Sequence, residues 1–267
     1  MNQPSSAVLS HDTARTAWTL RVRAALVHLG LSVLVATAVA ILVFAVWYPY
    51  PYREISGGRE LFLLVISVDV VLGPLLTLAV FNIRKPRAEL VRDLAVVALL
   101  QLSGLAYGLW TVHQARPVHM VFEVDRFRVV HRVDVPSELE ARTPAGIAVA
   151  PMGSPTPLSI RPFVDEKENM EMTLAALQGV QLAARPDLWE PYARGKDRIL
   201  RAAHPAAALL KRFPRDHALV EDAARRAGRS VAELAYLPLI GRKAEGWTVL
   251  LDARTAEIVD YLPLDSF

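Results

Sequence analysis

"LFLLVISVDVVLGPLLTLAVF", residues 61–81, is the stretch that decides the fold class. It is apolar over enough residues to cross about 30 Å of hydrocarbon as a helix. Asp69 lies near its middle, and Gly73-Pro74 follows. A charged aspartate at the centre of a bilayer costs roughly 2.5–3.5 kcal/mol on insertion scales. The stretch therefore predicts a transmembrane helix whose carboxyl group needs a polar partner.

Two more apolar stretches, residues 24–47 and 94–113, are each long enough to span a bilayer. Residues 24–47 also follow a basic start, as the core of a cleaved signal peptide does. Their apolar run is too long for a signal peptide, and Ala38-Val39-Ala40 is followed by more membrane-like sequence. The sequence thus predicts a three-helix transmembrane domain at residues 24–116, preceded by a cytoplasmic segment at residues 1–23.

The basic residues indicate how the helices cross the membrane, because Lys and Arg concentrate in short cytoplasmic loops. They are frequent in the N-terminal flank and between the second and third spans: Arg15, Arg21, Arg23, Arg84, Lys85, Arg87 and Arg92. The loop between the first two spans has only Arg53 and Arg59, each beside a glutamate. We expect a multi-pass membrane protein with its N-terminus in the cytoplasm and its C-terminal domain outside, which in a Gram-negative cell is the periplasm.

Asp69 has several candidate partners at a similar depth in the other spans: Thr37, Gln101, Ser103 and Tyr107. Gly104 and Gly108 have the spacing that lets two membrane helices approach closely. In one interpretation Asp69, in its neutral form, hydrogen-bonds within the three-helix bundle. In a second it meets a polar group on the helix of a client protein. In a third it relays protons, an interpretation that one isolated carboxylate supports weakly.

Pro74 follows Asp69 within the same span. A proline removes one backbone hydrogen bond of a helix and tends to kink it. We expect the kink to loosen the backbone close to Asp69. It sets the shape of the helix, or it makes a place where another helix fits.

Aromatic residues crowd the outer end of the first span, in "WYPYPYREISGGRELF", residues 47–62. They are Trp47, Tyr48, Tyr50 and Tyr52. Such residues form interfacial belts where a helix leaves the hydrocarbon. The sequence predicts a belt followed by a turn at Gly57-Gly58, and a docking surface for another membrane protein is the alternative.

Residues 117–267 are predicted to form an extracytoplasmic α+β domain. Apolar and polar residues alternate after Pro117, which predicts a hairpin turning near Asp125-Arg126. A second hairpin is expected to turn at residues 253–256. Asp165 and Glu168 are spaced to cap a helix whose apolar face would hold Met170, Leu174, Leu177 and Val180. A further helix is expected from about Asp216 to Gly228.

The charge distribution argues against a nucleic-acid-binding domain. Residues 1–116 carry 10 Lys and Arg against 6 Asp and Glu, and the remaining residues carry 20 against 21. The positive excess therefore accompanies the predicted membrane spans, whereas a nucleic-acid-binding domain is strongly basic itself. A local basic stretch at residues 194–215 is predicted to be a solvated helix face, with contact to anionic lipid or a partner as the alternative.

No motif in the sequence indicates catalysis. Nucleophile-elbow, zinc-protease, Walker and dinucleotide-binding patterns are all absent, and there is no cysteine. The seven histidines show no metal-ligand spacing, and the acidic cluster at residues 165–171 fits a helix N-terminus better than a metal site. We therefore predict a protein that is not an enzyme, with no catalytic residue, cofactor or metal.

Residues 48–130, from "YPYPYREISGGRELF" to "VHMVFEVDRFRVV", resemble the TfpX/TfpZ family of type IV pilin accessory proteins. "LAYLPLIGRKAEGWTVLLDARTAEIVDYLPL", near the C-terminus, also fits the family. The resemblance implies an inner-membrane, chaperone-like helper of a cognate major pilin that supports pilin stability or pilus assembly. Its expected partners are a type IV major pilin and the lipid bilayer. The alternatives are a membrane-anchored enzyme that modifies pilin, and a sensor, for which no cytoplasmic output domain is evident.

Overall fold

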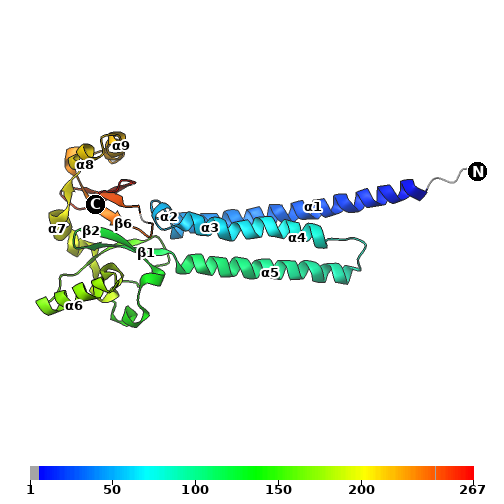
Figure 1. Cartoon of the computed structure of the whole chain (residues 1–267), viewed down its shortest axis with the longest axis horizontal. Helices are drawn as coiled ribbons and strands as arrows, with labels where there is room; N and C mark the ends of the chain where they lie inside the picture. The colour runs from blue at the N-terminus through cyan, green and yellow to red at the C-terminus, as the bar shows by residue number, and fades with distance from the viewer. Residues whose placement is uncertain (1–5, 244) are drawn as a thin grey trace, which may run out of the picture. The chain divides into compact units, whose positions relative to one another are not determined.

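The structure is a computed structural model that describes residues 6–243 and 245–267 (Figure 1). The chain divides into two compact units. The helical unit comprises the chain up to Val43 together with Arg59–His113, and the sheet unit comprises Phe44–Gly58 together with Gln114–Phe267. The first five residues of the predicted cytoplasmic segment lie outside the described residues, and helix begins at Ser6.

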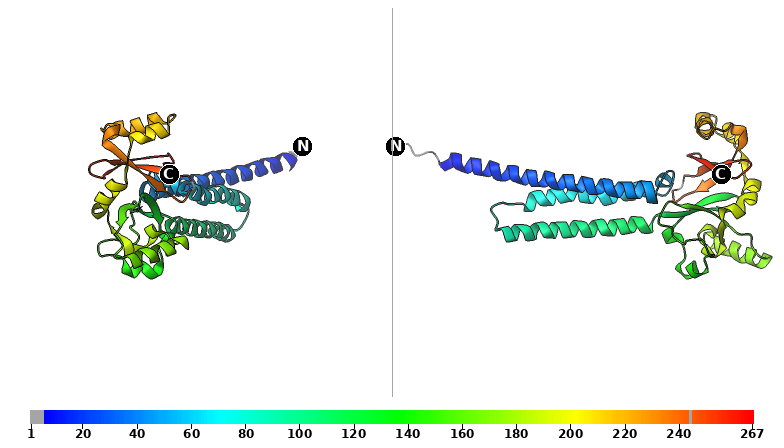
Figure 2. Two further views of the ribbon diagram at one scale, coloured as in Figure 1. Left: turned by 60° about the vertical axis from the view of Figure 1, so that its left-hand side comes forward. Right: turned by 180° about the vertical axis from the view of Figure 1, so that it is seen from behind.

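Three long helical segments make up the helical unit. The first is α1 (Ser6–Ile41), continued by a π-helical turn at Leu42–Trp47; the second is α3 (Gly58–Ser67), a π-helical turn (Val68–Leu72) and α4 (Gly73–Val80); the third is α5 (Arg87–Gln114). Stretches of each are long and apolar enough to cross a membrane: Arg15–Trp47, Gly58–Val80 and Arg87–Gln114. The three predicted spans are thus confirmed as helices of spanning length. Figures 1 and 2 show α4 running beside α1.

Pro74 explains why the second segment is not a uniform α-helix. In a regular helix the residue at position 74 would donate its N–H to the carbonyl of Val70, but proline has no N–H and its ring crowds that carbonyl. The turn before it widens into the π-helix at Val68–Leu72, and Gly73 N–H donates to the carbonyl of Asp69. The predicted disturbance near Asp69 is therefore a π-helical turn that contains Asp69 itself.

One mixed sheet forms the centre of the sheet unit, in the order β4-β3-β1-β2-β6-β7-β8, with β5 also paired to β6. The strands are β1 (Pro117–Glu123), β2 (Arg126–His131), β3 (Thr156–Ile160), β4 (Trp189–Pro191), β5 (His204–Pro205), β6 (Leu234–Ile240), β7 (Trp247–Asp252) and β8 (Ile258–Leu262). β1 and β3 are parallel, as are β2 and β6, and the other pairs are antiparallel. The α+β architecture expected from the sequence is present.

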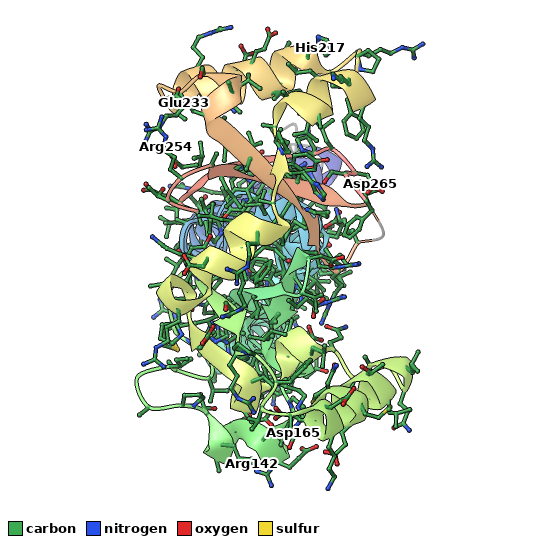
Figure 3. All side chains as sticks on the ribbon, turned by 90° about the vertical axis from the view of Figure 1, so that its left-hand side faces the viewer. Arg142, Asp165, His217, Glu233, Arg254 and Asp265 are labelled. Carbon is green, nitrogen blue, oxygen red and sulfur yellow. The ribbon has the colours of Figure 1, made fainter. Side chains whose placement is uncertain are left out.

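The remaining helices of the sheet unit are short. They are α2 (Tyr52–Ile55), α6 (Glu166–Leu177), α7 (Tyr192–Ala202), α8 (Ala207–Arg212) and α9 (His217–Arg226). Single 3-10 segments occur at Arg132–Asp134, Ser137–Arg142, Leu182–Ala184, Pro186–Leu188 and Val231–Glu233. Figure 3 shows α6, which begins after Asp165, at one end of the unit and α9, which begins at His217, at the other.

Strand residues alternate between the two faces of the sheet and fill separate cores. On one face lies a cluster from β1, β2, β6 and β7 that includes Met120, Phe127, Leu239 and Val249. The opposite face carries two clusters. One joins Val121 and Leu158 to Trp189, and the other joins Leu250 to Val220 of α9.

Both hairpins predicted from the sequence are confirmed. β1 turns into β2 through Val124-Asp125, and β7 turns into β8 through residues 253–257. Val124 and Ala256 have positive φ angles of 51° and 55°, the conformation in which tight turns reverse the chain. The helix expected near Asp216 runs from His217 and is followed by Gly228 at φ 64°, a left-handed residue that ends helices.

The start of α6 is as predicted, but its burial is not. Asp165 accepts a hydrogen bond from the backbone N–H of Glu168 at 2.7 Å. Glu168 in turn accepts from the N–H of Val164 and pairs with Arg161, which lowers the pKa of its carboxyl to about 2. The predicted apolar face is exposed, because the helix buries Met172 instead. Its exposed members are Met170, Leu174, Leu177 and Val180.

Candidate functional site in the helical unit

Asp69 and Gln101 form a hydrogen-bonded pair between the second and third helical segments. The amide Nε2 of Gln101 donates to Asp69 Oδ1 at 2.8 Å and to the backbone carbonyl of Asp69 at 3.2 Å. Gly73 makes this approach possible, because a Cβ there would lie 2.0 Å from Gln101 Nε2. Of the partners considered from the sequence, the structure therefore brings Gln101 to Asp69.

A second polar pair joins the first and second helical segments. His28 Nδ1 and Thr77 Oγ1 are 2.5 Å apart, and Thr77 is buried. Neither residue was among the candidates predicted from the sequence. The rule that picked Asp69 applies to His28 equally, since it is an ionisable side chain inside an apolar span.

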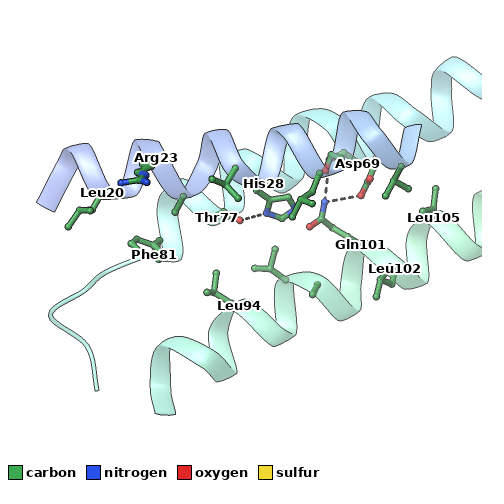
Figure 4. A pocket seen from close by; sticks show the side chains of 17 residues that line it. Leu20, Arg23, His28, Asp69, Thr77, Phe81, Leu94, Gln101, Leu102 and Leu105 are labelled. Carbon is green, nitrogen blue, oxygen red and sulfur yellow. Dashed lines mark hydrogen bonds between the residues drawn. The ribbon is translucent and has the colours of Figure 1, made fainter. Parts of the chain in front are cut away.

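The two polar pairs line one groove in the helical unit (Figure 4). Its volume is about 690 Å³; α1 and α5 contribute most of its wall, and the second helical segment adds Asp69 and Thr77. Most lining side chains are apolar, among them Leu20, Val27, Leu31, Phe81, Leu94, Leu102 and Leu105. The polar members are Arg23, His28, Ser32, Asp69, Thr77 and Gln101. The groove is thus an apolar channel with a few polar groups set along it.

α5 reaches the other helices at a few points and leaves a second hollow of about 320 Å³ beside α3. One point of close approach is Gly108, where a Cβ would lie 2.6 Å from Val65 Cγ1. The other small residue of the predicted pair, Gly104, has no neighbouring atom within 4 Å of such a Cβ. Both glycines line the second hollow, but of the two it is Gly108 that meets another helix closely, as the spacing predicted.

The other candidate partners of Asp69 lie elsewhere. Ser103 is exposed, and Tyr107 is 70% exposed, with its ring 5.9 Å from that of Trp110 on the same helix. Thr37 donates its hydroxyl to the carbonyl of Val33 within α1. Neither Ser103 nor Tyr107 lines the groove, although Tyr107 lines the second hollow.

The aromatic segment after the first span belongs to the sheet unit. This connecting segment, Phe44–Gly58, buries Trp47, Tyr48 and Tyr52, whereas Tyr50 is 48% exposed. Tyr52 and Ile55 join the core cluster on one face of the sheet. Burial raises the pKa of the Tyr52 phenol well above its usual value, so the phenol is neutral. The belt interpretation stays a prediction, and Tyr50 is the aromatic residue exposed enough to carry it.

Contacts with the C-terminal strands hold the connecting segment in place. The ring of Tyr50 meets Trp247 edge-on, with centroids 6.1 Å apart, and its hydroxyl donates to the carbonyl of Tyr261 at 3.3 Å. The carbonyl of Ile55 accepts from the N–H groups of Arg242 and Lys243. The loop between the first two helical segments is therefore a structural part of the sheet unit.

The polar groups of the groove can form hydrogen bonds but do not make a metal site. In the described part of the chain, no three His, Asp or Glu side chains are grouped so that they could hold a metal ion. The groove offers one carboxyl, one amide, one imidazole, one guanidinium and hydroxyl groups within an apolar wall. Such a site can receive an apolar molecule and recognise a few polar atoms on it.

Comparison with known proteins gives the same family by two routes. The family model of the fimbrial assembly protein FimB matches residues 16–57, which cover most of α1 and nearly all of the connecting segment. The fimbrial assembly protein of serogroup I from Dichelobacter nodosus is 34% identical over 242 residues, 90% of this chain and 94% of the relative.

Two further relatives from Dichelobacter nodosus agree with it. The serogroup E1 protein is 33% identical over 90% of this chain and 94% of its own length. The protein of serogroups C1 and C2 is 41% identical over 109 residues, 41% of this chain and 83% of its own length. No solved structure matches the chain. Because similarity to the serogroup I protein covers nearly the whole of both chains, this protein belongs to the fimbrial assembly protein family.

Proposed function

We propose that the protein is an inner-membrane accessory factor for type IV pilin, chaperone-like rather than enzymatic, that supports pilin stability or pilus assembly. Its relatives are named fimbrial assembly proteins, and three of its helical segments are long and apolar enough to cross a membrane. Before assembly, a pilin waits in the inner membrane on one apolar helix, with its head outside. The protein receives that helix in its membrane-spanning part, and the sheet unit faces the same compartment as the pilin head.

The groove between α1, α4 and α5 is the observation that carries this proposal. Apolar helices in lipid associate through packing and a few polar contacts, since lipid tails are as apolar as leucine. A groove of about 690 Å³ walled by three helices offers a fourth helix both kinds of contact. On α1 its lining runs from Leu20 to Val35, which corresponds to about 22 Å of helix axis.

Site-specific photo-cross-linking in native membranes tests the docking of pilin. A photoreactive residue at Leu31 or Leu102, both in the groove wall, is expected to capture pilin. The matched controls are Leu26 and Leu99, which are similarly exposed but do not line the groove. Equal capture of pilin from all four positions, or capture from none, would overturn the proposal.

Deletion of the gene separates the accessory role from a modifying enzyme. We expect less pilin or fewer surface pili, while the intact mass of the remaining pilin is unchanged. A pilin mass that differs between the deletion strain and its parent would instead support an enzyme that modifies pilin.

A further inference from the structure

We infer that the groove selects a client helix that carries a hydrogen-bond donor at the level of Asp69 and Gln101. The inference rests on the proposed function and adds to it the chemistry by which the client is recognised. The donor is a hydroxyl, amide or amine group on an otherwise apolar transmembrane helix.

Two oxygen atoms in the groove wall have no hydrogen-bond partner among the residues that the structure describes. The side-chain amide of Gln101 donates hydrogen bonds to Asp69 Oδ1 and to the backbone carbonyl of Asp69. Within the described part of the chain, no hydrogen bond reaches Asp69 Oδ2 or Gln101 Oε1. Figure 4 shows the Asp69 and Gln101 side chains between the helices, at the wall of the groove. The atoms through which Asp69 and Gln101 meet are therefore hydrogen-bonded, whereas Asp69 Oδ2 and Gln101 Oε1 are free to accept a hydrogen bond from another molecule.

Hydrocarbon cannot satisfy these oxygens. A polar group without a partner in a bilayer core is destabilising, and lipid tails offer no hydrogen-bond donor. Asp69 Oδ2 therefore requires a hydrogen bond that the described residues of the protein do not supply. A donor on a helix that occupies the groove meets that requirement without moving either residue.

A second polar pair fixes the position of the client helix along the groove. Thr77 lies eight residues after Asp69, about 12 Å along a helix, and its hydroxyl is bonded to His28 Nδ1. The other ring nitrogen of His28 has no partner among the described residues. A client helix with polar side chains about two turns apart meets both pairs in one position, whereas a uniformly apolar helix can slide.

The test uses cross-linking to pilin from Leu31 in the full chain, measured per molecule of accessory protein. Asp69→Leu removes both carboxyl oxygens, and we expect about three- to thirty-fold less cross-linking, because one hydrogen bond between membrane helices has about that effect on binding. Asp69→Asn keeps Oδ1 as the acceptor for Gln101 but replaces Oδ2 with an NH2 group, which cannot accept a hydrogen bond from the client, so we expect cross-linking to fall in this variant too. Ser67→Leu is the matched control, since Ser67 donates its hydroxyl to the carbonyl of Leu64 within its own helix and does not line the groove.

Replacing polar residues of the pilin helix with leucine, one at a time, locates the donor. Loss of the donor from pilin should lower cross-linking as much as Asp69→Leu does. Combining the pilin substitution with Asp69→Leu should lower cross-linking no further than either substitution alone. Undiminished cross-linking per molecule in Asp69→Leu overturns the inference, including when its abundance falls, and leaves the proposed function standing. An absence of cross-linking in the unsubstituted protein overturns the proposed function itself.

Discussion

The backbone carbonyl of Ile55 accepts a hydrogen bond from the backbone N–H of Arg242 at 3.0 Å. Ile55 lies in the loop between the first two helical segments, and Arg242 lies between β6 and β7. The two residues come from opposite ends of the sequence of the sheet unit. Ile55 is 1% exposed, so the bond is part of the core rather than a surface contact.

We predict that Gly241→Ala loosens this attachment. A Cβ at Gly241 would lie 2.6 Å from the carbonyl oxygen of Ile55, and backbone cannot give way as a flexible side chain does. The substitution is expected to cost about 1–3 kcal/mol of the free energy of unfolding. Gly153→Ala is the control, because no atom lies within 4 Å of a Cβ there. Thermal unfolding of the detergent-purified protein compares the two, and equal midpoints would contradict the prediction.

In the helical unit, Gly108→Ala is expected to be harmful and Gly104→Ala mild. The new methyl group at position 108 would lie 2.6 Å from Val65 Cγ1, whereas the space around Gly104 is open. Val65→Ala should make room, so that Gly108→Ala costs less in that background. Thermal unfolding of the parent, Gly108→Ala, Val65→Ala and the double variant measures the coupling free energy between the two positions. A Gly108→Ala effect unchanged by Val65→Ala would show that the two residues do not meet.

The stability of the sheet unit is expected to fall between about pH 6.5 and pH 4 because of His119. His119 is 1% exposed, Nδ1 lies 2.6 Å from Thr156 Oγ1, and burial lowers its pKa from 6.5 to about 4. The unfolded chain therefore binds the proton more readily in this interval, so stability is full above pH 6.5 and is lost as the pH falls. The loss is on the order of 3 kcal/mol.

His119→Gln removes this titration and keeps a polar side chain at the site. Unfolding by urea at pH 7 and at pH 4.5 should show a smaller difference for His119→Gln than for the parent protein. An equal pH dependence in both would mean that other groups account for the acid sensitivity.

The orientation predicted from the basic loops is open to a direct measurement. Paired reporter fusions, one active only in the cytoplasm and one only in the periplasm, are placed after Asn82 and after Phe267. We expect a cytoplasmic signal at Asn82 and a periplasmic signal at Phe267, because Lys and Arg flank the second loop. A cytoplasmic signal at Phe267 would place the sheet unit in the cytoplasm, on the opposite side of the membrane from the pilin head.

Local sequence patterns predicted most of the elements. Apolar runs predicted the three spanning helices, and alternation bounded by turn residues predicted the β1–β2 and β7–β8 hairpins. These features depend on neighbours in the chain, whose geometry a strand or helix fixes by itself. Burial depends on distant neighbours as well. The apolar stripe of α6 was recognised from its spacing, but its exposure depends on what the sheet leaves uncovered.

The polar partner of Asp69 was only partly predictable. Depth in the membrane follows from position along a span, and it selected Gln101, Ser103 and Tyr107 together. Which of them faces Asp69 depends on the rotation of α5 about its axis. Gln101 and Ser103 are two residues apart, about 200° around the helix, so that only one of them can point at Asp69. The place of the connecting segment was harder to foresee, because its contacts with Trp247 and Tyr261 span nearly the whole chain.

The sheet unit is built from two separate pieces of chain, and this determines the sequence of steps in its biosynthesis. The ribosome delivers Tyr52 and Ile55 early, but their partners Arg242, Trp247 and Tyr261 emerge last. In the proposed topology, the first hairpin is inserted and its loop exported while the core that will receive the loop does not yet exist. The core of the sheet unit can be completed only after the last strands, β7 and β8, have been synthesised. A nascent chain that stalls before residue 240 therefore leaves Tyr52 and Ile55 without their contacts to the last strands of the sheet.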